Sequence, residues 1–299
     1  MGAKQERNKK HAIAFYTTIA NDLDPVKAFD LYGGFWYRQH NPDVADDKKG
    51  FLEHFEAVVN TDIEITSYVV RAIAEDDLVM LHLWCPPPSN FPLEHTEENY
   101  KRYCLVAMEM FRFSEDGRII EHWNVANWMP MPFKWLTIGD IAVEPWWPEG
   151  AYTHLEVPIS SHTMIDGETE IRDLDRTLEN KEKAREFVQQ VLIQHKFEKF
   201  ETYFGDNLIQ HIQHLPDGVA AYKKGIQEFE PVLGLKYLMN HRSVAEGNFV
   251  FIYSQGIFRG RTTAIGDLFR FDKGKIVEIW QCDYEALPEK VIAHNNTLF

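Results

Sequence analysis

The spacing of apolar residues predicts that the chain begins with a helix and later turns to strands. An apolar stripe recurs at steps of four, three and four residues: Ala12, Tyr16, Ile19 and Leu23. These residues share one helical face, which must be buried. Across residues 118–125 the period changes to two, which is typical of a strand.

Similar strings recur in the two halves of the chain, in the same order and at a nearly constant offset. Asn8-Lys-Lys-His-Ala-Ile-Ala-Phe15 resembles Asn180-Lys-Glu-Lys-Ala-Arg-Glu-Phe187, an offset of 172 residues. Gln39-His40 recurs as Gln210-His211 at an offset of 171, and Glu121-His-Trp123 recurs as Glu278-Ile-Trp280 at 157. The first copy therefore carries about thirteen extra residues after Trp84, and the sequence predicts an internal duplication.

Each copy reads as helix, helix and then strands, and its last two strands are expected to form a hairpin. The turns fall at Ser114-Glu-Asp-Gly117 and at Asp272-Lys-Gly274. Helices followed by strands favour an α+β fold in which an antiparallel sheet carries helices on one face. Between the copies, Pro145-Trp-Trp-Pro148 marks a connector whose tryptophans are expected to pack against a domain.

Composition narrows the class of protein. The 299 residues are 44% hydrophobic and 26% charged, as in ordinary globular proteins, and the net charge of -15 argues against nucleic-acid or anionic-membrane partners. No apolar run approaches the length of a membrane span, and no signal peptide is recognised at the start. Three cysteines without a CxxC pair, Cys85, Cys104 and Cys282, fit a reducing compartment, so a cytoplasmic location is expected.

These strings resemble the SnoaL-like branch of the nuclear-transport-factor-two-like superfamily, which includes polyketide cyclases and ketosteroid isomerases. The resemblance rests on Tyr37-Arg-Gln-His-Asn-Pro42 and Gly117-Arg-Ile-Ile-Glu-His-Trp-Asn124 in the first copy, and on Gln210-His211 and Gly266-Asp-Leu-Phe-Arg270 in the second. It implies two tandem cone-shaped α+β barrel domains, 1–135 and 161–299, joined by a connector at 136–160. In each, a curved antiparallel sheet would wrap around helices and an apolar pocket. Relatives pair through the outer sheet face, which implies an intramolecular pseudo-dimer and leaves a homodimer open.

The strongest candidate for chemistry is a carboxylate beside a histidine. Period-two alternation places His122 and Asn124 on one face of the last strand and Glu121 and Trp123 on the other. If the hairpin pairs Phe113 with Arg118, Glu109 lies directly opposite His122. A carboxylate at that distance can orient an imidazole, which is the geometry of a general acid or base.

Further polar residues are expected around this pair. His82 shares a strand face with Leu78, Met80 and Trp84, and His40 follows the second helix where family pockets receive a polar residue. If all face inward, His40, His82, Glu109, His122 and Asn124 form one catalytic group working near neutral pH. Each also has a structural interpretation, since a lone strand histidine is more often a hydrogen-bonded core residue. The remaining substrate-contact candidates are Tyr37, Trp84, Trp128, Asp267, Asp283, His211 and Tyr253.

The sequence departs from the family at the expected general base. Relatives commonly carry Asp after the His-Trp pair, whereas this chain has Asn124 and Gln281, and an amide cannot take a proton. The second copy also has Ile279 for the strand histidine, Tyr253 at the position of His82, and Asp267 opposite Ile279. The first copy is therefore the expected catalytic one.

Three functions remain open from the sequence. The first is cofactor-independent acid/base chemistry, such as cyclisation, isomerisation or dehydration, on a small hydrophobic carbonyl compound. The second is a protein that binds such a ligand without changing it, which the missing Asp favours. The third is a metal-dependent enzyme that uses His40, His82, His122 and Glu109 as ligands. No nucleotide-binding fingerprint is found, and no cofactor is expected.

Overall fold

The computed structural model describes residues 2–60, 66–87, 89, 96–97, 101, 104–128, 137–138, 141–142, 161–212, 215–229, 234–258, 260–285 and 293–299. We refer to residues 2–128 as the first half and to residues 161–285 as the second half. Most of the predicted connector, including Pro145-Trp-Trp-Pro148, most of the proline-rich insertion and His214 lie outside the described residues.

The first half begins with helices and a strand in alternation. It ends with four strands that form two hairpins. Its elements are α1 (Ala3–Ala20), α2 (Pro25–Tyr32), β1 (Gly33–Gln39), α3 (Asp47–Val59), β2 (Tyr68–Glu75), β3 (Leu78–Cys85), β4 (Leu105–Phe113) and β5 (Ile119–Trp128). The predicted apolar stripe is largely buried, since Ala12 and Ile19 pack in the core, although Leu23 is exposed. Two short strands, β6 (Thr137–Ile138) and β7 (Ile141–Ala142), follow.

The second half follows the same plan with shorter helical pieces. Its helical segments are η1 (Leu174–Arg176), α5 (Thr177–Phe187), η2 (Val188–Ile193), η3 (Phe197–Tyr203), α6 (Val219–Lys224) and η4 (Gly225–Phe229). Its strands are β8 (Phe204–Gln210), β9 (Lys236–Glu246), β10 (Phe249–Phe258), β11 (Arg261–Asp272) and β12 (Lys275–Glu285). No helix in the described part of the chain has the length and apolar character needed to cross a membrane.

The two halves contain five-stranded sheets of the same strand order. The first sheet runs β1-β5-β4-β3-β2 and the second runs β8-β12-β11-β10-β9. The prediction of an α+β fold with terminal hairpins is confirmed, and Gly117 and Gly274 occupy the turns with positive φ. Two details were wrong. The sheets are open rather than closed barrels, and they are mixed, because β1 and β8 pair in parallel with β5 and β12.

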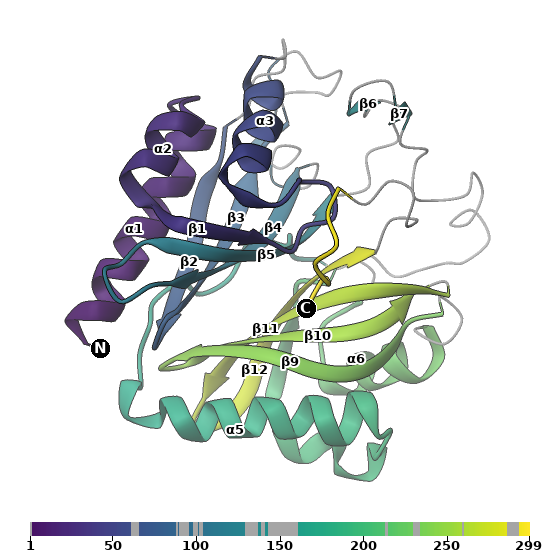
Figure 1. Cartoon of the computed structure of the whole chain (residues 1–299). Helices are drawn as coiled ribbons and strands as arrows, with labels where there is room; N and C mark the ends of the chain where they lie inside the picture. Colours follow the sequence, from purple (N-terminus) through teal and green to yellow (C-terminus); the bar gives the residue numbers. More distant parts are fainter. Residues whose placement is uncertain are drawn as a thin grey trace.

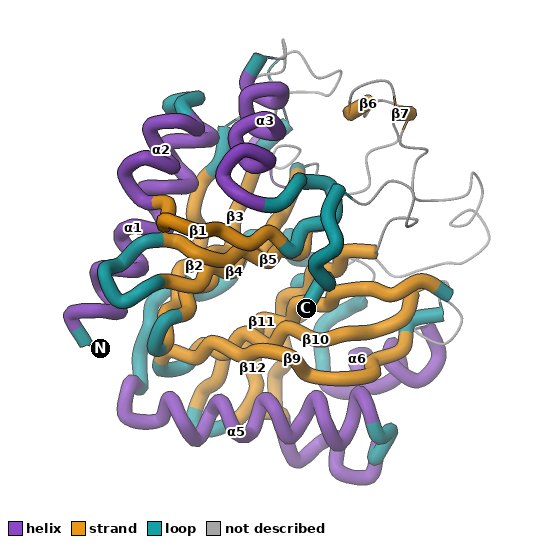
Figure 2. The backbone as a smooth tube through the Cα atoms, in the orientation of Figure 1, coloured by secondary structure: helices purple, strands orange, loops and turns teal. Residues whose placement is uncertain are grey.

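Four layers are visible in Figure 1, helices outside and the two sheets between them. The tube in Figure 2 shows α1, α2 and α3 over the first sheet and α5 and α6 over the second. Each sheet has an inner face, which packs on its own helices, and an outer face, which packs on the other sheet. The cluster between the sheets is apolar and includes Trp123, Trp280, Phe251 and Met108, each fully or almost fully buried.

Reciprocal contacts join the halves at the ends of β2 and β9. Glu75 accepts hydrogen bonds from the Ala245 amide and from Lys181 of the second half. Glu246 accepts from the Ala74 amide and from Lys9 of the first half. The two sets of partners therefore exchange roles, as residues do across a twofold axis in a dimer.

Candidate functional site

Glu109 and His122 meet on the inner face of the first sheet, as the sequence predicted. Glu109 Oε2 lies 2.5 Å from His122 Nε2, and both side chains are buried. The expected register was wrong, because Glu109 lies opposite Asn124, and Phe111 lies opposite His122. A bulge at Ile120 of β5 and the longer turn shift the pairing by two residues, which keeps Glu109 and His122 on one face and makes the contact diagonal.

Gln39 fixes the position of the protons on the His122 ring. Its Oε1 accepts hydrogen bonds from the backbone amides of His40 and Asn41, at 3.0 and 2.9 Å, so this atom must be the amide oxygen. The same oxygen lies 2.8 Å from His122 Nδ1, which must therefore carry a hydrogen. Gln39 reaches this position because β1 pairs with β5 and places Gln39 beside His122.

It follows that Glu109 and His122 share one proton on the line between Oε2 and Nε2. Since Nδ1 is protonated, a second ring proton on Nε2 gives an imidazolium facing a carboxylate. Without it, the proton must be on Glu109, facing a neutral ring. In both forms this buried pair can hold a proton and release it, as a general acid or base requires.

Phenols and apolar rings surround the pair. The ring of Phe111 stacks on His122 with centroids 4.9 Å apart. Tyr37 receives a hydrogen bond on its hydroxyl from Gln39 Nε2, and its pKa is raised well above its usual value by burial and by the charge of Glu109. Burial likewise raises the pKa of Tyr16, with smaller contributions from Cys85 and Glu109. Both hydroxyls therefore stay protonated at neutral pH.

Asn124 belongs to the same face and presents an amide. Its Oδ1 is buried and has no hydrogen-bond partner among the described residues. An unsatisfied buried acceptor is costly, so this oxygen marks a place where a ligand donor can be accommodated.

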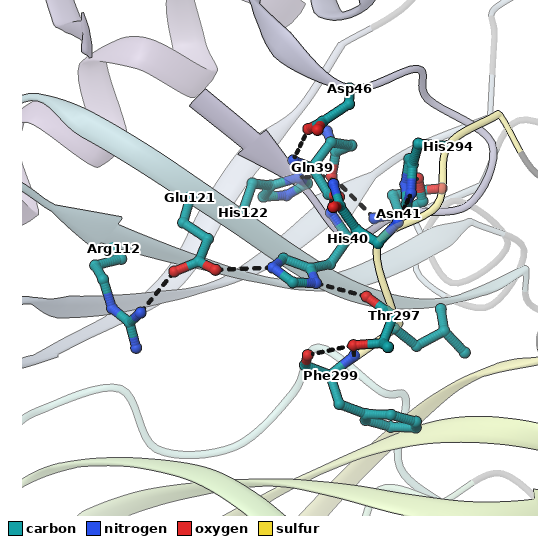
Figure 3. Close-up of polar contacts among 12 residues, drawn as sticks. Gln39, His40, Asn41, Asp46, Arg112, Glu121, His122, His294, Thr297 and Phe299 are labelled. Atoms are coloured by element: carbon teal, nitrogen blue, oxygen red, sulfur yellow. Dashed lines mark hydrogen bonds and ion pairs between the residues drawn. The ribbon is translucent and has the colours of Figure 1, made fainter. Parts of the chain in front are cut away.

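His40 does not join this group, which corrects the sequence expectation. Its ring stacks on Trp123 with centroids 4.7 Å apart, on the outer face of the sheet. Figure 3 shows the ring between Glu121 and the backbone oxygen of Thr297, with Nε2–Oε1 and Nδ1–O distances of 2.9 and 2.5 Å. Arg112 binds the other oxygen of Glu121. Burial opposes ionisation of Glu121, yet its bond to His40 and the charge of Arg112 leave its pKa below the usual value.

His82 also lies on the outer face, together with Met80 and Trp84, so the single inward group was wrong. Its Nδ1 is 3.1 Å from Arg71 NH1, and its ring makes an edge contact with Trp280 of the second half. Burial lowers the pKa of His82 well below its usual value, and the charges of Arg71 and His211 lower it further. A neutral histidine packed between two sheets is suited to a structural role.

The inner face of the second sheet carries a different polar group, centred on Asp267. This fully buried carboxylate accepts hydrogen bonds from the Tyr237 hydroxyl and from Gln281 Nε2, at 3.1 and 3.0 Å. Asp267 lies opposite Gln281, not opposite Ile279 as expected, because a matching bulge occurs at Val277 of β12. Burial raises the pKa of Asp267 to about 7, although the bonds from Gln281 and Tyr237 lower it.

Replacing Asp267 by asparagine should stabilise the protein at alkaline pH. The folded-state pKa of about 7 exceeds the usual 3.8, so the stability linked to this proton is complete below about pH 4 and is lost as the pH rises through 7. The asparagine side chain would keep the acceptor oxygen without the charge. In urea unfolding, we expect a gain on the order of 3 kcal/mol near pH 8 and little change near pH 4. The exposed Asp206→Asn is the control, and a gain independent of pH would contradict the prediction.

The other predicted contact residues are dispersed. His211 is buried on the outer face, where it binds Glu278 and the Thr163 oxygen and stacks on Trp280. Tyr253 lies in the same layer and donates to the Leu298 oxygen. Asp283 bonds Asn127 of the first half, and Trp84 packs on Tyr68 at the outer face. The side chain of Trp128 lies outside what the structure describes.

The structure also adds residues that the sequence did not single out. Gln39 was noticed only as part of a repeated string, and Tyr16 only as part of an apolar stripe. Among the described residues, no group of three or more His, Cys, Asp or Glu side chains is arranged to hold a metal ion. His40, His82 and His122 do not converge, so the geometry gives no support to the metal-dependent alternative.

No protein-family model matches the chain, and no curated protein sequence matches it. Several solved structures resemble parts of it at low sequence identity. An epoxide hydrolase of Mycobacterium tuberculosis, described as LEH-like, is 19% identical with a TM-score of 0.30 over 37% of this chain and 85% of its own. A SnoaL-like polyketide cyclase from Agrobacterium tumefaciens is 13% identical with a TM-score of 0.30 over 35% and 91%. An NTF2-like protein from Anabaena variabilis is 16% identical with a TM-score of 0.32 over 41% and 98%.

Proposed function

We propose that the first half is an enzyme domain that performs cofactor-independent acid/base chemistry on a small hydrophobic carbonyl compound. The observation that carries this proposal is the 2.5 Å contact between Glu109 Oε2 and His122 Nε2, with Gln39 holding the far side of the ring. A buried pair of this kind can take a proton from a carbon next to a carbonyl group and return it elsewhere. Cyclisation, isomerisation and dehydration all contain such a step.

The residues on the inner face of the first sheet suggest a role for each in the reaction. The Glu109–His122 pair takes the proton as the C–H bond breaks, and the electron pair moves to the carbonyl oxygen. Donors are needed where that oxygen becomes negative, and the protonated hydroxyl of Tyr16 and the amide of Asn124 are the candidates. His40 and His82, which the sequence placed in this role, are instead proposed to be structural.

We further propose that the two halves are SnoaL-like domains, 1–135 and 161–299, joined by a connector at 136–160. Equal strand orders and the reciprocal contacts of Glu75 and Glu246 support a duplication that forms a pseudo-dimer within one chain. In the second half Ile279 replaces His122 and Leu208 replaces Tyr37, so its inner face lacks the histidine. We therefore propose that only the first half is catalytic.

The test begins with the compound that the protein carries. Purified protein should release a small apolar carbonyl compound, identified by mass spectrometry, which is then used as substrate. With this substrate, His122→Ala should lower turnover about 10²- to 10⁴-fold, the usual contribution of a general acid or base. His241→Ala, which removes an exposed histidine of the second half, is the control. Full activity of His122→Ala would reject the assignment.

The alternative function is binding without chemistry, and the amide of Asn124 at the position of the family's Asp is the observation that favours it. In that case the compound should be recovered unchanged after long incubation with the protein. Any product formed by wild-type protein and not by His122→Ala would exclude it.

A further inference from the structure

Two matching arginine–tryptophan pairs lie between the sheets, one from each half. The Arg71 guanidinium of the first half lies 4.2 Å over the Trp280 ring of the second. The Arg242 guanidinium of the second half lies 4.0 Å over the Trp123 ring of the first. The arginines are 171 residues apart and the tryptophans 157, the offsets of the internal repeat.

The first of these pairs is fully supplied with acceptors by the chain itself. Arg71 donates to the backbone oxygens of Glu168, Asp166 and Ile165, at 2.8, 2.6 and 3.4 Å. Trp280 Nε1 donates to the same Asp166 oxygen at 3.0 Å. The first residues of the second half thus satisfy both side chains with peptide oxygens.

The second pair lacks these acceptors. Trp123 is completely buried, yet its Nε1 has no hydrogen-bond partner in the described part of the chain, and the same is true of the buried Nε of Arg242. A buried donor left unsatisfied costs about 1–3 kcal/mol, and native proteins rarely keep two side by side. These donors therefore indicate a position where something outside the described chain binds.

The first pair also has more acidic residues around it than the second pair. Arg71 lies near Glu278 and Arg270, and also near the acidic residues Asp166 and Glu168. Among the described residues, the charges that act on Arg242 come from Glu121, Arg112 and the phenol of Tyr253. Burial, opposed by Glu121 and aided by Arg112, lowers the pKa of Arg242. An anion would supply the charge that Asp166 and Glu168 supply in the matching place.

We propose that Arg242 and Trp123 form a binding site for the carboxylate group of a small molecule. A carboxylate offers the planar pair of oxygens that a guanidinium binds with two hydrogen bonds, and one oxygen can also accept from the indole Nε1. Arg71 and Trp280 likewise donate to carbonyl oxygens of the peptide backbone. A carboxylate, whose acceptors are also oxygens bound to a planar carbon, is therefore favoured over anions such as chloride. The site lies between the sheets and is separate from Glu109 and His122 on the inner face.

The test is a titration with N-acetylglycine, which carries a carboxylate beside a peptide carbonyl, followed by the indole N–H signals in NMR spectra. The Trp123 signal, assigned by its loss in Trp123→Phe, should shift and saturate at millimolar concentrations. The Trp280 signal should stay in place, because its donor is already bound. N-acetylglycinamide and sodium chloride at equal ionic strength are the uncharged and salt controls.

Arg242→Gln should weaken the binding at least tenfold, and Arg242→Lys, which keeps the charge but not the planar fork, should weaken it less. An unchanged Trp280 signal shows that each variant is folded; if neither folds, the comparison of Trp123 with Trp280 in wild-type protein decides. Absence of a saturable Trp123 shift, or the same shift with the neutral amide or with chloride, would overturn the proposal.

Discussion

Replacing Glu109 by glutamine is expected to lower turnover about 10²- to 10⁴-fold while leaving the fold intact. The glutamine side chain can still hydrogen-bond His122, because its amide N–H can donate to Nε2 while Gln39 continues to accept from Nδ1. The variant therefore keeps the geometry and loses only the shared proton. The measurement is the steady-state rate on the co-purified compound, together with a urea unfolding curve for each variant.

Asp267→Asn is the matched control, because Asp267 occupies in β11 the position that Glu109 occupies in β4. It removes a carboxylate at the same place in the second half, where Ile279 stands instead of the histidine. We expect full turnover from it. If Asp267→Asn lost activity and Glu109→Gln kept it, the reacting centre would belong to the second half, and the raised pKa of Asp267 would make that carboxyl the candidate base.

The contact between Glu109 and His122 could be predicted because it depends only on local features. Two strands joined by a short turn must pair, and alternation assigns each residue to a face. The exact register could not be predicted, since the bulge at Ile120 has no clear sequence signal. The predicted contact was still correct, because a register shift of two residues leaves Glu109 and His122 on the same face of the sheet. A shift of one residue would have placed them on opposite faces.

The positions of His82 and His40 could not be predicted for a different reason. Strand β3 is buried on both faces, so its sequence shows no polar side from which the inner face could be recognised. Leu78, Met80 and Trp84 do share a face with His82, as expected, but that face packs on the second sheet. His40 is held by Thr297, a residue 257 positions away, and no local pattern reveals such a contact.

Two hydrogen bonds to residues outside the sheets were also not evident from the sequence. Thr163, at the start of the second half, binds His211 of the same half, while Thr297, beyond the second half, binds His40 of the first. Both histidines stack on a tryptophan and face a glutamate that is held by an arginine. The first half therefore depends on a segment that the chain places beyond the second half, and the halves are expected to unfold together.

Glu246→Ala is expected to destabilise this joint fold by about 3–5 kcal/mol, the cost of breaking a buried ion pair from one side. Glu246 is 3% exposed and its Oε2 lies 2.7 Å from both Lys9 Nζ and the Ala74 amide, so truncation leaves a cation and an N–H without a partner. In urea unfolding, the midpoint should fall without a change in slope. Glu75→Ala, at the matching but more exposed position, should cost less, and Glu246→Gln should recover the part due to the amide bond. A loss below about 1 kcal/mol for Glu246→Ala would mean that the reciprocal contacts do not hold the halves together.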